Sequence, residues 1–282
     1  MKRLISIEFQ KLFKNKASKI LIITYFSFLA LLFLITNIEF DLGPIHINAA
    51  EQGIFNFPYI WHFNTYFADF FKIFLAVIIV SMMANEYTYG TLKQNLIDGM
   101  SKKEFILSKF LTVVIFTTIS TLFVFVISIT LGLIYSSFTE VSIIFSELDY
   151  LLAYFIKLLC FFSFCLFLGV LIKRSAFALG FLFFWYVFEK ISFGMLKYGL
   201  LQTKKGEDSI IDSIYQFFPF ESMSNLIVEP ITRLKFVKTI GDQVGIENVK
   251  DYSIHFADLS VVIIWTIIFI YLSFRILRKR DL

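Results

Sequence analysis

Six long apolar runs are the feature that most constrains how this chain folds. A helix that crosses a bilayer needs about 20 predominantly apolar residues. The runs occupy residues 20–38, 67–84, 110–133, 151–172, 176–196 and 259–276. Charged residues make up only 17% of the chain, whereas soluble domains average about a quarter. At these lengths only helices satisfy their backbone polar groups in hydrocarbon. The sequence therefore predicts an all-α integral membrane protein, a single transmembrane domain over residues 1–282 with six transmembrane helices.

The charges between these runs predict the orientation of the chain. Short cytoplasmic loops are enriched in Lys and Arg. The loops 39–64 and 135–150 contain carboxylates but no basic residue, whereas Lys173 and Arg174 join the fourth run to the fifth and the C-terminal tail is basic. We therefore expect both termini in the cytoplasm and the protein in the cell membrane. The long segment 197–258 is then external, and its length places its own basic residues outside the reach of the charge rule.

The first seventeen residues form a segregated pattern. Ile5, Phe9, Leu12 and Phe13 share one face of a helix, and the opposite face is polar and basic. This spacing predicts an N-terminal amphipathic interface helix over residues 1–17, lying along the cytoplasmic membrane surface. A solvated basic leader is the alternative.

The polar stretch 85–104 separates the second and third runs. Gly99 favours the end of a short helix, because glycine tolerates the left-handed backbone of a C-terminal cap. Ser101 and Glu104 have the spacing of a capping box that begins the next helix. On the short helix, Leu92 and Leu96 form a small apolar ridge. The ridge either faces a partner protein or packs beneath the helix, and the pattern leaves both open.

Enzymatic chemistry finds little support. The chain has no P-loop lysine motif and no G-x-S-x-G motif. Its histidines, His46, His62 and His255, fall in expected external loops. Cys160 and Cys165 share one apolar run, which favours neither a disulfide framework nor a zinc site. We expect no enzyme activity, no metal, no cofactor and no nucleic-acid partner.

Five ionisable residues fall inside or at the edges of the apolar runs, all toward the outer side. They are Asp69, Lys72, Lys157, Glu189 and Lys190. Charges in a membrane usually mark a functional path. The alternative is that Asp69 and Lys72 form a structural pair on one helix face and that the long lysines extend to the interface.

The segment 214–227 is apolar but too short and too interrupted to cross a membrane. A re-entrant segment, covered by protein, is one interpretation, because irregular backbone at membrane depth must be buried in protein or water. An external amphipathic helix is the other.

The polar stretch, at its place between the second and third runs, resembles a known family. It carries Glu86-Tyr87-x-x-Gly90-Thr91-Leu92-Lys93, then Gly99-x-Ser101-Lys102-Lys103-x-Phe105, and then Lys109 at the start of the third run. Permease subunits of ABC-2 type exporters have a similar E-Y-x-x-G-T-L segment and G-x-S-[RK] turn. The N-terminal Glu8-Phe9-Gln10-Lys11-Leu12-Phe13 is similar to the interface helix of that family. Lys102, where arginine is common, is a mild departure.

The resemblance implies a permease subunit of an ABC exporter, working with a second permease in the lipid bilayer and with a separate nucleotide-binding ATPase subunit. It implies a peptide, a bacteriocin or an amphipathic antibiotic as substrate. It also assigns contact with the ATPase to residues of the polar stretch, namely Glu86, Tyr87, Gly90, Thr91, Leu92, Leu96, Gly99, Ser101 and Lys102. The interface helix is represented by Glu8, Lys11, Leu12 and Phe13. The competing hypothesis is a multi-span protein without ATP drive, either a secondary carrier or a membrane assembly scaffold.

Overall fold

The structure is a computed structural model that describes residues 2–31, 39–42, 45–48, 53–138, 140–200, 210–234, 237 and 250–280. Helices dominate these residues, as the apolar runs predict. The expected loop 39–64 differs from the prediction in two ways. It contains an antiparallel hairpin of β1 (Glu39–Leu42) and β2 (Ile45–Asn48), in which Glu39 pairs with Asn48. It also contains the start of a helix at Tyr59.

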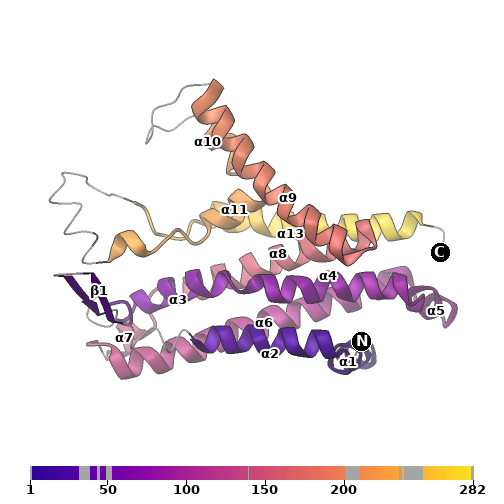
Figure 1. Cartoon of the computed structure of the whole chain (residues 1–282), viewed down its shortest axis with the longest axis horizontal. Coiled ribbons are helices and arrows are strands. Elements are labelled where there is room, and N and C mark those ends of the chain that lie inside the picture. The colour runs from indigo at the N-terminus through magenta and orange to yellow at the C-terminus, as the bar shows by residue number, and fades with distance from the viewer. Residues whose placement is uncertain are drawn as a thin grey trace.

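The long helices of the described chain run roughly side by side, except for α9, which is inclined to the rest (Figure 1). They are α2 (Lys16–Leu31), α4 (Lys72–Thr88), α6 (Lys102–Tyr135), α8 (Asp149–Ile172), α9 (Ser175–Gly194) and α13 (Phe256–Lys279). By length and composition, four helices of the described chain are long and apolar enough to cross a membrane, and a bent pair of helices makes a fifth candidate. The first predicted span, 20–38, lies partly outside the described residues. The described helices thus provide up to five candidate spans, against the six predicted from hydropathy.

The second predicted span is not one straight helix. It is divided into α3 (Tyr59–Asp69) and α4, whose axes differ by 46°. Between them the backbone N–H of Phe70 bonds to Phe67 and that of Phe71 bonds to Ala68, a tighter turn than an α-helix has. Most sharp kinks occur at proline or glycine, and neither is present here, so the hydropathy pattern contains no sign of the break. Asp69 and Lys72 flank it.

Helix α8 is the centre of the bundle. It is apolar all around, as expected of a helix surrounded by protein, and it packs against α13, α4, α6, α9 and α3. Gly169 permits a close approach to α4, because a Cβ atom added there would lie 2.8 Å from the Cβ of Met83. Small residues serve this purpose where helices meet in membranes.

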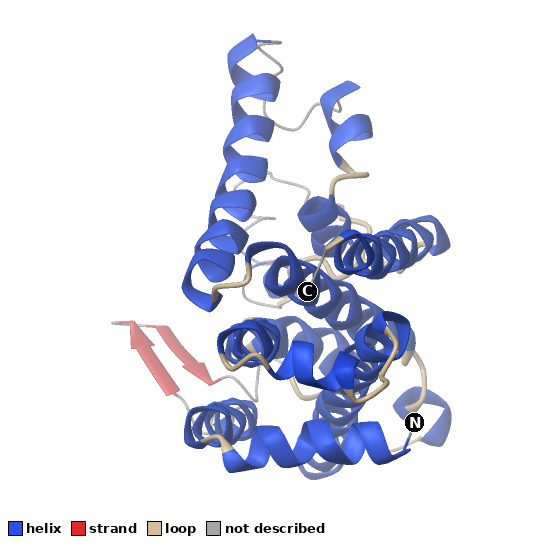
Figure 2. Cartoon of the chain, turned by 90° about the vertical axis from the view of Figure 1, so that its right-hand side faces the viewer, coloured by secondary structure: helices blue, strands red, loops and turns tan. Residues whose placement is uncertain are grey.

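Both termini and the polar stretch lie at the same end of the bundle, at the right in Figure 1. The first helix, α1 (Lys2–Lys14), lies across the axes of the long helices (Figures 1 and 2). Asn15 ends it, and the side-chain oxygen of Asn15 caps α2 by accepting a hydrogen bond from the backbone N–H of Ala17 at 3.0 Å. The short helices α5 (Thr91–Ile97) and α7 (Val141–Ile144) lie at opposite ends.

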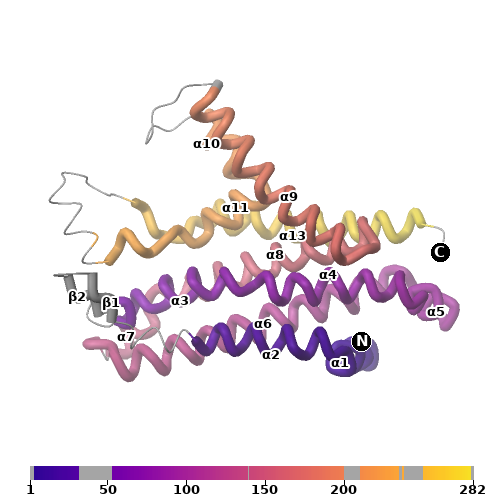
Figure 3. Tube along the Cα trace, viewed as in Figure 1, coloured from indigo at the N-terminus to yellow at the C-terminus, as the bar shows by residue number. Residues whose placement is uncertain are grey.

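Helix α9 leans away from the bundle and continues into a π-helical turn, η2 (Met195–Leu200), as the tube in Figure 3 shows. Its long side chains are largely uncovered by the rest of the chain, and the share of Phe183 that is exposed is 68%. This face is apolar, which suits lipid or another membrane helix.

The segment 197–258 is not simply a loop outside the bundle. Its described part contains α10 (Ile210–Tyr215), α11 (Pro219–Asn225) and a 3₁₀ turn, η3 (Ile231–Arg233). Helix α11 packs against α8, α9 and α13. The Phe220 ring lies 5.6 Å from the Phe164 ring, and Phe164 is about 22 Å along α8 from its start at 1.5 Å per residue. Helix α11 is thus packed against the long helices, well away from the start of α8.

Candidate functional site

The polar stretch folds as its sequence pattern predicts. Gly90 precedes α5 with a positive φ of 66°, and Gly99 follows that helix with a φ of 95°. Ser101 then caps α6: its hydroxyl accepts from the N–H of Glu104 at 3.1 Å, and the Glu104 carboxylate accepts from the N–H of Ser101 at 2.9 Å. The predicted break and capping box are confirmed. Helix α5 is thereby joined to α4 and α6 by short, ordered turns.

Side chains from four helices meet beside α5 in one ion cluster, composed of Glu8, Lys11, Glu86, Thr91 and Lys109. The Lys109 Nζ lies 2.6 Å from Glu8 Oε2 and 2.6 Å from Glu86 Oε1. The Lys11 Nζ lies 2.8 Å from the same Glu86 oxygen. Thr91 donates its hydroxyl hydrogen to the other oxygen, Oε2 of Glu86. Two carboxylates therefore face two ammonium groups, and the cluster is electrically balanced.

The ions of this cluster are largely buried, so separating them is costly. Lys109 is fully buried and the side chain of Glu86 is 3% exposed. A buried ion is costly unless it keeps its partners. The partners come from α1, α4, α5 and α6. A shift of α1, α4 or α6 relative to the others separates the buried Lys109 from a buried carboxylate, and a shift of α5 removes the Thr91 hydroxyl from Glu86. The cluster thus ties the four helices together.

The cluster refines the part that the sequence assigns to Glu86. This carboxylate faces inward, toward Lys109, and is not on the surface available to a partner protein. In the sequence, Lys109 stands out only as a residue at the start of the third apolar run. A lysine just inside an apolar run is an expensive placement that implies a partner, and this signal marks the residue. It does not identify Glu8 and Glu86 as the partners.

The two leucines of α5 pack inward. Leu92 is 2% exposed, and Leu96 is partly buried against the core. The outward face carries Lys93, together with Ile97, which is 70% exposed, and the adjacent Tyr89, which is 74% exposed. The sequence left open whether the ridge of Leu92 and Leu96 faces a partner protein or packs beneath the helix. In the structure the ridge packs beneath α5, and a different set of side chains faces outward.

The apolar face predicted for α1 is divided between two surroundings. Leu12 is buried, and the Phe9 ring lies 6.0 Å from the Phe116 ring of α6. Phe13, by contrast, is exposed. The helix therefore docks on the bundle with part of its face and leaves Phe13 free for another apolar environment.

Tyr87 and Lys102, also predicted as contacts of a partner, hold the C-terminal end of the chain. The guanidinium of Arg280 donates to the Tyr87 hydroxyl at 2.9 Å and to the backbone oxygens of Val170 and Leu171. The Lys102 ammonium donates to the backbone oxygen of Arg280 at 2.8 Å. The sequence shows the tail only as basic, so this contact between α4, α6, α8 and α13 was not predicted.

The five charges predicted near the outer side form two groups. In the first, Asp69 Oδ2 lies 2.7 Å from the Lys72 Nζ and 3.2 Å from the Lys157 Nζ. The alternative interpretation had Lys157 extending to the interface. The structure differs, because Lys157 is buried. In the second, the Glu189 carboxylate accepts the backbone N–H of Glu221 at 2.8 Å. Lys190 completes that group by pairing with the Glu221 side chain.

A further contact region at the opposite end was missed. His62, expected in a loop, lies in α3 and is buried, with its ring stacked 4.4 Å from that of Tyr150. A nitrogen of Arg233 lies 3.0 Å from His62 Nδ1, and the Tyr59 hydroxyl donates to the backbone oxygen of Arg233 at 2.9 Å. These contacts fasten the chain after α11 to α3. Paired tertiary contacts of this kind leave no local pattern in the sequence.

Comparison with known proteins identifies the family of this chain. No match is found among curated proteins. The sequence model of one family, described as ABC-2 family transporter protein, matches residues 4–282. The match includes every residue of the ion cluster, the polar stretch and the long helices. This chain therefore belongs to the ABC-2 family of transporter proteins.

Proposed function

We propose that this chain is the permease subunit of an ABC exporter, which forms the membrane pathway with a second permease. ATP hydrolysis on a separate nucleotide-binding subunit drives it. The observation that carries the proposal is the buried ion cluster, because it joins the short helix α5 to α1, α4 and α6 at the end of the bundle where both termini lie.

The arrangement suits the transmission of force. Leu92 anchors α5 from beneath, while Gly90 and the Ser101 cap connect it to α4 and α6 without slack. A rigid element with two arrangements can move its neighbours as a body, whereas a loose loop cannot. Closure of an ATPase dimer against α5 then displaces α4 and α6, and the Glu86 and Lys109 ion pair carries α1 with them.

The outward face of α5 is the proposed ATPase contact. We expect Ile97→Glu to lower the amount of ATPase that co-purifies with the tagged chain by about thirtyfold, because loss of an apolar anchor at the centre of an interface costs on the order of 2 kcal/mol. Quantitative pull-down checks this. Lys279→Glu, an exposed change at the same end of the bundle, is the matched control and should leave the amount unchanged. Equal capture by all three forms contradicts the assigned contact.

We also propose that the chain lies in the cell membrane, crosses it six times and has both termini in the cytoplasm. The Lys173 Nζ lies 5.6 Å from the centre of the Tyr87 ring. The turn with Lys173 and Arg174 is therefore at the end of the bundle that holds α5, which supports this orientation under the charge rule. The first span is the predicted run 20–38, of which α2 is the described part. Helix α1, lying across the long helices, suits the membrane surface, where its exposed Phe13 meets lipid.

Thiol labelling tests this topology. Cys160 and Cys165 are both fully buried, so the parent chain should not react with a membrane-impermeant maleimide. We expect Asp251→Cys to react from outside intact cells and Lys93→Cys to react only after the membrane is opened, because both positions are exposed at opposite ends. Labelling of both positions from the same side contradicts the proposed topology.

The second permease has a natural place on α9. That helix leans out of the bundle with an uncovered aromatic face, and packing against another membrane helix suits such a face. For the substrate, the proposal follows the resemblance to exporters of peptides, bacteriocins and amphipathic antibiotics.

A further inference from the structure

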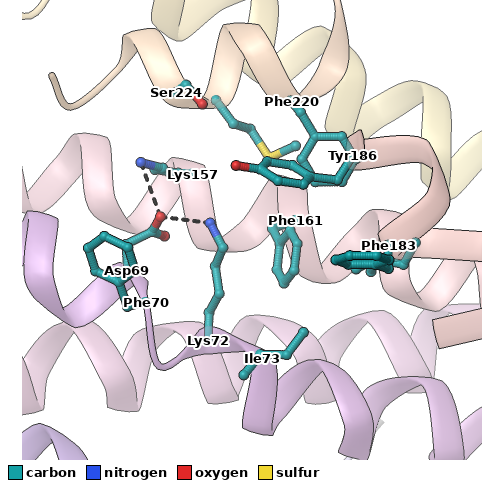
Figure 4. Close-up of a pocket in the computed structure, with 12 residues that line it drawn as sticks. Asp69, Phe70, Lys72, Ile73, Lys157, Phe161, Phe183, Tyr186, Phe220 and Ser224 are labelled. Atoms are coloured by element: carbon teal, nitrogen blue, oxygen red, sulfur yellow. Dashed lines mark hydrogen bonds and ion pairs between the residues drawn. The ribbon is translucent and has the colours of Figure 1, made fainter. Parts of the chain in front are cut away.

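A cavity lies within the single chain, on the outer half of the bundle, where α3 and α4 break apart. It has a volume of about 340 Å³ and is bounded by α4, α8, α9 and the inserted helix α11. Ligand pockets in proteins start at about this volume. Figure 4 shows Asp69, Lys72 and Lys157 toward one side, with the Phe70 ring beside Asp69, and the rings of Phe161, Phe183, Tyr186 and Phe220 toward the other. At 1.5 Å per residue, Lys72 lies about 24 Å along α4 from the end that carries Glu86.

The charged side of the cavity has an excess of positive charge. Lys72 and Lys157 share a single carboxylate, Asp69, and both ammonium groups contact the same oxygen, Oδ2. The other oxygen, Oδ1, is buried and has no hydrogen-bond partner among the described residues. Each ammonium group has three donors, so donors remain for a guest. Two cations with one anion leave a net charge of +1 on side chains that are largely buried, which favours the entry of an anion.

Neighbouring charges do not line this cavity. Lys190 pairs with the Glu221 side chain, and Oε1 of Glu189 accepts the Glu221 backbone N–H around the start of α11. The other Glu189 oxygen, Oε2, is buried and has no hydrogen-bond partner among the described residues, but Glu189 does not line the cavity. The cavity wall itself contains no further ionisable group apart from Tyr186 among the described residues. The charge that a guest meets is therefore that of Asp69, Lys72 and Lys157.

The opposite side of the cavity is apolar and aromatic. Phe161, Phe183, Tyr186 and Phe220 supply rings, and Met223 supplies a flexible thioether side chain. Such walls favour an alkyl or aromatic body and adapt to its shape. The Lys72 Nζ lies 4.6 Å from the centre of the Phe161 ring, so the ammonium stands at the boundary between the charged side and the apolar side (Figure 4).

We propose that this cavity binds an amphiphile that has one anionic head and an apolar body. The head, a carboxylate or a phosphate, accepts hydrogen bonds from Lys72 and Lys157. The body lies against the rings of α8, α9 and α11. The claim that the cavity binds such an amphiphile concerns this chain alone. The further claim that the amphiphile is the exported cargo rests on the proposed export function.

The test measures equilibrium binding of radiolabelled dodecanoate to the purified full chain in phosphatidylcholine nanodiscs without any ATPase. Unlabelled dodecyl phosphate should compete, while dodecanol and dodecyltrimethylammonium should compete at least about tenfold less well, because a hydrogen bond to a charged group contributes that much. These comparisons use the unaltered chain, so they do not depend on whether a variant folds. Equal competition by the cationic amphiphile overturns the proposal.

Variants locate the site. Lys72→Gln makes the three-residue group neutral and should weaken dodecanoate binding about tenfold or more, whereas Lys72→Arg should retain it. Lys190→Gln removes the same charge outside the cavity and is the matched control. Ser224→Trp fills the cavity and should abolish binding. Unchanged binding by Lys72→Gln and Ser224→Trp overturns the proposal.

A second arm replaces part of the phosphatidylcholine with phosphatidylglycerol. If this lipid competes as dodecyl phosphate does, the natural occupant is a lipid headgroup. If it does not, the occupant is a separate amphiphile. Both outcomes support an anion-binding cavity. Absence of any dodecanoate binding overturns it and leaves ATP-driven export, tested separately, unaffected.

Discussion

Replacement of Lys109 by methionine should cost about 3–5 kcal/mol of stability and should uncouple the chain from ATP hydrolysis. This magnitude is typical when one partner of a buried ion pair is removed. Here the loss is shared by two carboxylates, since Lys109 lies 2.6 Å from both Glu8 and Glu86. Methionine fills a similar volume, so the effect is one of charge and not of packing. Thermal unfolding of the purified protein in detergent measures it.

The control for this change lies on the same helix. Lys103 is exposed at the start of α6, and Lys103→Met should change stability by only a few tenths of a kcal/mol, as surface substitutions usually do. Adding Glu86→Gln to Lys109→Met should recover part of the loss, because neighbouring residues of one network are not additive. If Lys109→Met unfolds at the same temperature as Lys103→Met, the ion cluster does not hold the helices together.

Replacement of Gly90 by valine should leave membrane insertion intact and strongly reduce the coupling of ATP hydrolysis to export. The φ of Gly90 is 66°, and an added Cβ would meet no atom within 4 Å. The cost is therefore one of backbone conformation. It is about 1–2 kcal/mol for the left-handed region, enough to shift an equilibrium by about 5–30-fold. The α4–α5 turn should change shape, and α5 should lose its alignment.

Asparagine at the same position separates this explanation from a general intolerance of side chains. Asn adopts the left-handed region more readily than other residues, so Gly90→Asn should retain most of the activity that Gly90→Val loses. Substrate-stimulated ATP hydrolysis by the reconstituted complex is the measurement. Equal activity of the two variants contradicts the proposed role of the turn.

The local features of the candidate site were predictable from sequence. Gly99 and the Ser101 and Glu104 pair act through residues within a few positions of themselves, and each lies where the pattern predicts. The positive φ of Gly90 was not predicted. The ion cluster was not predictable in the same way. Glu8 and Lys109 are separated by 101 positions, and their meeting depends on how α1 crosses the bundle.

Hydropathy predicted the helices better than their shapes. It averages over about 20 residues, so it does not detect the turn of Phe70 and Phe71 that divides α3 from α4. It also treats 197–258 as one external segment and does not detect that α11 packs against α8, α9 and α13. Short apolar helices of this kind depend on neighbouring helices for cover, and those neighbours are distant in sequence.

The most direct test of the account is the rate of ATP hydrolysis by the separate ATPase subunit, measured with and without this chain in the same nanodiscs. The account predicts that the chain alone hydrolyses no ATP and that the unaltered chain raises the rate of the ATPase. It also predicts that Lys109→Met binds the ATPase without raising that rate. The account is contradicted if the rate is the same with the unaltered chain, with Lys109→Met and with no chain, while an ion gradient drives transport through the chain alone.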